Sequence, residues 1–139
     1  MTTRDRVGVL VGLLAVVVAA QLGGQTVHEI ELRGDLSEGD YGFAPAEISA
    51  RPGDILRFRV GSGAPHSIAF DSTGLARAAK AALNRAMPGR VSQLRGPLLV
   101  NEGETYRMVV PRLPSGRYRF YCLTHQVYEA SGTLILPEG

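Results

Sequence analysis

The chain has 139 residues, of which 45% are hydrophobic and 20% charged, and its formal net charge is +2. This length suits one domain, and the composition is that of a globular rather than a disordered protein. The charge is nearly balanced and no basic stretch is interleaved with aromatic residues, so nothing in the sequence predicts nucleic-acid binding.

The first 20 residues have the pattern of an export signal. Two arginines precede an uninterrupted apolar run of fourteen residues, from Val7 to Ala20. As a helix this run would span about 21 Å, which is short of the roughly 30 Å hydrocarbon core of a bilayer. We therefore expect residues 1–20 to be a signal peptide and 21–26 a short linker, with the protein exported to the bacterial periplasm or another extracytoplasmic space. The alternative is an uncleaved N-terminal anchor, which would be the only contact with a membrane.

Short alternating segments then predict strands through residues 27–139, which we take as one domain. They lie at residues 27–33, 47–50, 55–60, 66–70, 105–110, 118–122 and 131–136. The turn Pro52-Gly53-Asp54 and similar Gly-rich links separate them. Roughly seven or eight short strands without a βαβ pattern predict an all-β sandwich with Greek-key connections.

One segment, residues 72–97, departs from the strand pattern. Strong helix formers run from Leu75 to Ala86; Asp71-Ser72-Thr73 would cap this helix and Met87-Pro88-Gly89 would end it. The insert has no acidic residue and five basic ones: Arg77, Lys80, Arg85, Arg90 and Arg95. It is either a solvated helix that covers one sheet face, which we prefer, or an electrostatic contact for an acidic partner.

A cysteine and a histidine three positions apart stand between the last two predicted strands. Cys122 is the only cysteine of the chain, His125 follows it, and His66 lies at another predicted strand end. Two imidazoles and one thiolate with a weak axial ligand are the donor set of a blue-copper electron-transfer site. A buried structural cysteine, a Cys-His protease pair and a zinc site are weaker interpretations, and we expect His28 to be structural.

This pattern resembles the cupredoxins, in particular the small plastocyanin- and pseudoazurin-like proteins. The resemblance runs from about residue 27 to 136, through the segments Phe43-Ala44-Pro45, Arg51-Pro52-Gly53-Asp54, Pro65-His66-Ser67, residues 116–122, His125 and Gly132-Thr133. It implies a monomeric electron carrier rather than an enzyme, with one copper ion cycling between Cu(I) and Cu(II) and exchanging electrons with a redox protein. The ligands would be His66, Cys122 and His125.

The axial ligand is where the chain departs from the family. Cupredoxins usually carry a methionine just before the closing glycine, and Ala130 takes that place here. Met87 and Met108 are not placed to substitute. The site is then three-coordinate, or Glu129 or Tyr128 supplies an oxygen, or tight copper binding has been lost.

The resemblance also assigns roles around the ligands. His125 would be the exposed edge through which electrons pass, with Pro65, Leu123, Val127 and Tyr128 as an apolar docking patch. Ser67 stands where asparagine often follows the ligand, and it would tie the two ligand loops together less firmly. Two other functions remain open: copper storage, delivery or sensing, and an interaction domain that uses the fold without metal.

Overall fold

The computed structural model describes residues 21–22, 24–35, 37–128 and 130–138, so the predicted signal peptide lies outside the described residues. Within the described ranges, no helix is long and apolar enough to cross a membrane.

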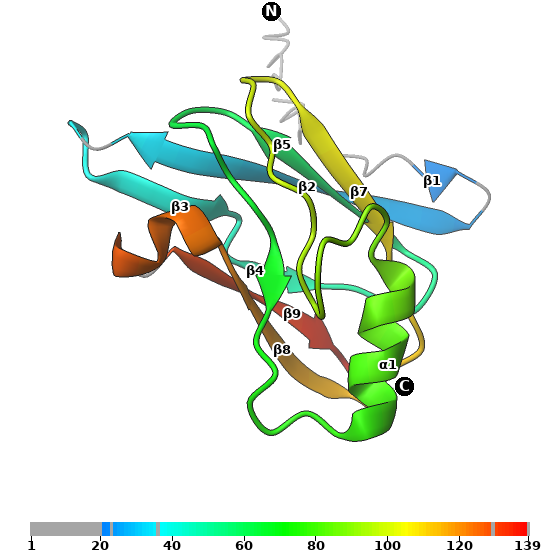
Figure 1. Ribbon diagram of the computed structural model, residues 1–139. Helices are drawn as coiled ribbons and strands as arrows, with labels where there is room; N and C mark the ends of the chain where they lie inside the picture. The colour runs from blue at the N-terminus through cyan, green and yellow to red at the C-terminus, as the bar shows by residue number, and fades with distance from the viewer. Residues whose placement is uncertain (1–20, 23, 36, 129, 139) are drawn as a thin grey trace, which may run out of the picture.

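Two β-sheets pack face to face (Figure 1). The first has the order β1-β2-β5-β7, with β3 also paired to β2; its strands are β1 (Gln21–Leu22), β2 (Gln25–Asp35), β3 (Asp40–Ala44), β5 (Ile55–Val60) and β7 (Thr105–Val109). The second has the order β4-β9-β8-β6, formed by β4 (Glu47–Ser49), β9 (Ser131–Leu136), β8 (Gly116–Tyr121) and β6 (Ala69–Phe70). The pairs β2–β5 and β4–β9 are parallel and the others antiparallel. The predicted all-β Greek-key sandwich is confirmed.

Several strand boundaries differ from the prediction, and the described part of the chain contains nine strands. Residues 21–26, predicted as a linker, hold β1 and the start of β2, because Gln21 pairs with Thr26 in a short hairpin. The predicted strand at 66–70 is reduced to β6. Its backbone instead bonds to residues 94–99, which begin within the insert and run past its end: His66 N donates to Leu99 O at 2.9 Å, and Gly96 N donates to Ile68 O at 2.9 Å.

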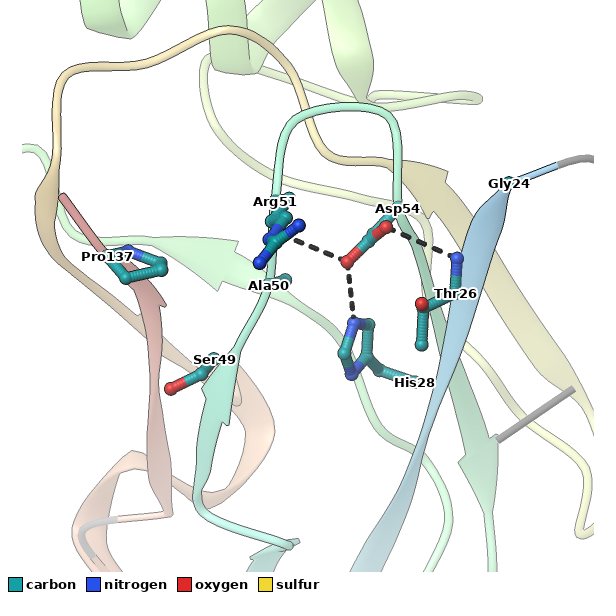
Figure 2. Close-up of a pocket in the computed structure, with 8 residues that line it drawn as sticks. All are labelled: Gly24, Thr26, His28, Ser49, Ala50, Arg51, Asp54 and Pro137. Atoms are coloured by element: carbon teal, nitrogen blue, oxygen red, sulfur yellow. Dashed lines mark hydrogen bonds and ion pairs between the residues drawn. The ribbon is translucent and has the colours of Figure 1, made fainter. Parts of the chain in front are cut away.

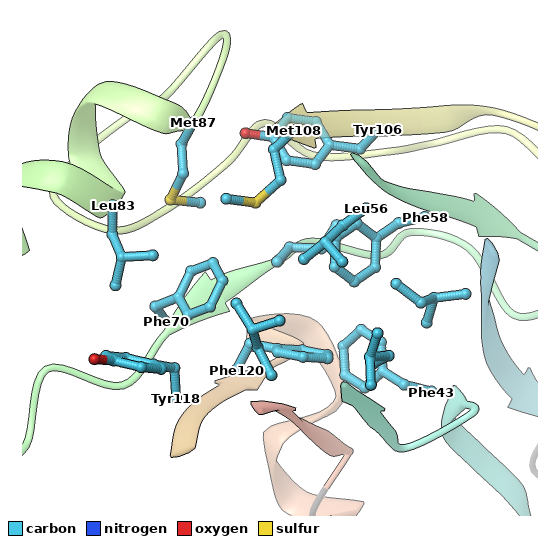
Figure 3. Packing of buried hydrophobic residues seen from close by; sticks show 14 of the residues in the cluster. Phe43, Leu56, Phe58, Phe70, Leu83, Met87, Tyr106, Met108, Tyr118 and Phe120 are labelled. Atoms are coloured by element: carbon cyan, nitrogen blue, oxygen red, sulfur yellow. The ribbon is translucent and has the colours of Figure 1, made fainter. Parts of the chain in front are cut away.

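The core is built around Phe120 of β8 (Figure 3). Its ring meets Phe43 edge-on at 4.8 Å between centroids and Phe58 at 5.5 Å, so aromatic side chains of the first sheet pack against it. Position 132 must be glycine, because a Cβ there would lie 2.5 Å from the Phe120 ring. Tyr118, Phe120 and Cys122 alternate along this part of the chain with their side chains directed inward, and all three are buried.

The predicted helix is α1, Arg77–Ala86, which begins two residues later than expected. The cap prediction is wrong: α1 has no side-chain cap, and Asp71 Oδ1 accepts a hydrogen bond from Thr73 N in the preceding turn. Ala79 and Leu83 are buried in the core, so the helix covers one end of the sandwich. In Figure 1, α1 lies on the opposite side of the molecule from the 3-10 turn η1 (Leu123–Tyr128).

A buried carboxylate joins β2 to the turn before β5 (Figure 2). Asp54 accepts hydrogen bonds from Thr26 N at 3.2 Å, Arg51 N at 3.0 Å and His28 Nε2 at 2.9 Å. Burial alone would raise the pKa of Asp54, but these bonds hold it below the ordinary value of 3.8. The ionised carboxylate therefore fastens β2 to the turn before β5.

Replacing Asp54 with alanine should lower the free energy of unfolding by about 2–4 kcal/mol, because three donors lose their acceptor in a buried place. The stabilisation is fully present above the ordinary pKa of 3.8 and is lost as pH falls through the depressed folded-state pKa. Urea unfolding of both proteins at a series of pH values measures this. The control is Asp40→Ala, which removes an exposed pair with Arg33 and should cost less than about 1 kcal/mol. Equal losses in the two variants would contradict this account.

Candidate metal centre

The three residues singled out from the sequence meet at one end of the sandwich. Cys122 directly follows β8, His125 lies in η1, and His66 comes from the segment between β5 and β6. One donor atom from each lies within 4.8 Å of the others. Cys122 Sγ is 3.7 Å from His66 Nδ1 and 3.4 Å from His125 Nδ1.

The His66 ring is oriented by a backbone carbonyl. His66 Nε2 lies 2.5 Å from Ser62 O, and a carbonyl oxygen only accepts, so Nε2 carries the proton. Nδ1 then presents its lone pair toward Cys122 Sγ. Fixing one ring nitrogen by a hydrogen bond is how proteins prepare the other to bind a metal.

The Cys122 sulfur is buried and surrounded by polar contacts. Ser67 N donates to it at 3.4 Å, and Thr124 Oγ1 lies 3.0 Å away. Burial alone would raise the pKa of Cys122, but the contacts with His66, Ser67 N and His125 lower it from 9.0 to about 6. Burial would also lower the pKa of His66, and its bonds to Cys122 and Ser62 raise it instead. The thiolate, which is the form that binds metals, is therefore favoured at neutral pH.

Two hydrogen bonds tie the loop of His66 to the loop of Cys122 and His125. Ser67 Oγ accepts from Leu123 N at 3.2 Å, the bridging role expected of Ser67. Thr124 Oγ1 donates to Pro65 O at 2.8 Å. Sequence reasoning missed Thr124, because a threonine in a loop gives no signal until its partner, 59 positions away, is known.

The donor geometry fits a single soft metal ion. Two donors about 2.0–2.3 Å from a shared ion and about 120° apart lie about 3.8 Å from each other. The distances of 3.7 and 3.4 Å from the sulfur to the imidazole nitrogens are close to that value. One thiolate and two neutral imidazoles suit copper better than a hard cation such as Mg²⁺.

The residues considered for the axial position contribute no side-chain donor among the described residues. Ala130 is buried and its methyl group cannot bind a metal, while its carbonyl accepts from Cys122 N at 3.0 Å. Glu129 and the side chains of Val127 and Tyr128 lie outside what the structure describes. Met87 and Met108 pack in the hydrophobic core (Figure 3).

His28 is not part of this cluster. It binds Asp54 beside a cavity of about 480 Å³ that Ser49, Arg51 and Pro137 help to line (Figure 2). This contact is consistent with the structural role expected of His28.

Comparison with known proteins identifies the family. The model of copper-binding proteins of the plastocyanin/azurin family matches residues 30–137. The chain belongs to this family. It is 32% identical to plastocyanin of Sambucus nigra over 98 residues, which are 70% of this chain and 88% of that protein.

Solved structures agree with this assignment. Oxidised plastocyanin from Dryopteris crassirhizoma is 26% identical, with a TM-score of 0.60 over 78% of this chain and 99% of that one. A pseudoazurin from Sinorhizobium meliltoi shares the fold, at 20% identity and a TM-score of 0.53 over 81% of this chain and 74% of that one. The protein is thus a cupredoxin, a copper electron-transfer protein rather than an enzyme.

The thiol of the metal-free protein should ionise with a midpoint near pH 6, because the hydrogen bonds around Sγ favour the thiolate. The ultraviolet absorbance of the thiolate, followed against pH and corrected with Cys122→Ser, measures this midpoint. In urea the same absorbance should appear near the ordinary value of 9.0. A folded-state midpoint at or above the value in urea would show that burial outweighs the hydrogen bonds.

Proposed function

We propose that this cupredoxin is an exported single-electron carrier whose one copper ion is held by His66, Cys122 and His125. The observation that carries the proposal is the convergence of these donors within 4.8 Å, with Nδ1 of both imidazoles facing the sulfur. A copper ion bound there would take up and release one electron between Cu(II) and Cu(I).

The protein's contribution is to hold the donors nearly fixed. His66 is held by Ser62 O, the sulfur by Ser67 N, and the two loops by the bonds of Ser67 and Thr124. Cys122 also belongs to the hydrophobic core, two positions from Phe120. Donors that cannot move far keep the reorganisation accompanying electron transfer small.

We place the electron-transfer edge at His125, which is half-buried and therefore reaches the surface. Exposed Pro65 and half-buried Leu123 lie on the two loops beside it and would form the docking patch with Val127 and Tyr128. Leu98 and Val100, 49% and 56% exposed, flank the Leu99 that pairs with His66 and would extend this apolar patch. A small contact area with a redox protein suits a short-lived complex.

The basic helix α1 does not lie beside the electron-transfer edge at His125. α1 and η1 lie on opposite sides of the molecule, and the buried face of α1 packs on the core (Figure 1). This arrangement supports the interpretation of α1 as a cover over the end of the sandwich. The redox partner then reaches His125 without contacting α1.

Removal of the expected signal peptide, residues 1–20, should be detectable directly. After expression of the full chain in a bacterial host, we expect the extracytoplasmic protein to begin at Gln21, because small residues precede that position. Intact-mass measurement of the purified protein checks this. Retention of residues 1–20 in a membrane fraction would favour the anchored alternative.

The purified protein with one equivalent of Cu(II) should show an intense visible thiolate-to-copper charge-transfer band, together with a reversible one-electron wave. Cys122→Ser should abolish the band, because it removes the sulfur. His66→Asn should weaken or abolish it, whereas the matched variant His28→Asn should leave it unchanged. Visible absorption, electron paramagnetic resonance and voltammetry make the comparison.

Two outcomes would contradict the proposal, and a third would show that the variants are unsuitable. A band without a reversible wave would favour storage or delivery of copper. No band, with copper removed by washing, would favour an interaction domain without metal. Loss of the band in His28→Asn as well would show that the variants act by unfolding the protein.

A further inference from the structure

The Thr124 hydroxyl holds two loops together through Pro65, and it also contacts two of the three proposed ligands. Its hydroxyl oxygen lies 2.8 Å from Pro65 O, 3.0 Å from Cys122 Sγ and 3.2 Å from His125 Nδ1. It is thus an oxygen atom beside two of the three proposed ligand atoms, and it comes from the residue between them in the chain.

The single hydroxyl proton decides how this oxygen is oriented. Pro65 O can only accept, and it is the nearest of the three partners, so the Thr124 proton points to that carbonyl. The oxygen lone pairs are then left on the side of Sγ and Nδ1. Donating to a carbonyl also makes a hydroxyl oxygen a better electron-pair donor, because hydrogen bonds in a chain polarise one another.

We propose that Thr124 Oγ1 is the fourth donor of the copper site and takes the place of the missing methionine. The inference rests on the proposed function of His66, Cys122 and His125. Donors about 2.1–2.3 Å from one ion and about 90° apart are separated by about 3.1 Å. The distances from Oγ1 to Sγ and Nδ1, 3.0 and 3.2 Å, have this value.

Among the side chains that the structure describes, the other residues considered for this position supply no donor. The side chain of Ala130 is a buried methyl group, which cannot bind a metal, and both Met87 and Met108 lie in the core. An oxygen donor is harder than a thioether and favours Cu(II) over Cu(I), so Thr124 should lower the reduction potential relative to an apolar fourth position.

The deciding experiment compares Thr124→Val, which keeps the shape and removes the hydroxyl, with Thr124→Ser, which keeps the hydroxyl. The control is Thr105→Val, at an exposed position of β7. β7 belongs to the first sheet, whereas β8, which leads to the metal centre, belongs to the second. Each copper-loaded protein is examined by electron paramagnetic resonance, by voltammetry and by chelator competition for Cu(II) and for Cu(I). The melting temperature of each metal-free protein is measured alongside.

We expect Thr124→Val to lose about tenfold in Cu(II) affinity with little change for Cu(I). For a one-electron couple this equals a rise in potential of about 59 mV. The copper hyperfine splitting should change with it. Thr124→Ser should stay within about twofold of the unmodified protein, and Thr105→Val should be unchanged. If Thr124→Val does not fold, Thr124→Ala tests the same loss.

Two results would overturn the inference, and they are distinguishable. A lower melting temperature for Thr124→Val with an unchanged potential and resonance spectrum would show that Thr124 only clamps the loops. The absence of any charge-transfer band in the unmodified protein would overturn the ligand set itself, and the fourth donor with it.

Discussion

The metal centre depends on one contact between distant parts of the chain, in which the Cys122 sulfur meets the loop of His66. The sulfur is 56 residues from His66 in sequence, yet Ser67 N and His66 Nδ1 both face it. This contact requires the end of β8 and the segment of His66 to lie at the same level along the sandwich. The pairing of β8 with β9 fixes one end, and the bonds of 66–70 to 94–99 fix the other.

The hydrophobic core continues without interruption into this contact. Phe120 anchors β8 against the first sheet, and Cys122 is the next inward residue of the same alternation. Ala130 O and Cys122 N then close the loop between β8 and β9. Since protein interiors are closely packed, a displacement of the sulfur would disturb the aromatic contacts as well. The rigidity useful for electron transfer is therefore a property of the core.

The parts of the structure that depend on local pattern could be predicted from the sequence. Alternation identified β5, β8 and β9 nearly to the residue, and the short spacing of Cys122 and His125 placed both in one loop. His66 could be assigned only by resemblance, because nothing local distinguishes it from His28. The path of 94–99 along the His66 segment was missed, since Gly96 and Pro97 interrupt any strand pattern there and only tertiary hydrogen bonds hold it. Thr124 was missed for a similar reason, because its role appears only when Pro65 is beside it.

The same hydrogen bonds explain why the site is ready for a metal before one arrives. They favour a thiolate at Cys122, and they raise the pKa of the neighbouring His66, so the proton is shared within a buried pair. A buried charge needs a partner, and in the metal-free protein the imidazole of His66 provides it. When a cation replaces that proton, the thiolate keeps a positive neighbour at the same place. The surrounding dipoles of Ser62 and Ser67 then need no rearrangement, because Ser62 O holds the far nitrogen of His66 and Ser67 N already faces the sulfur.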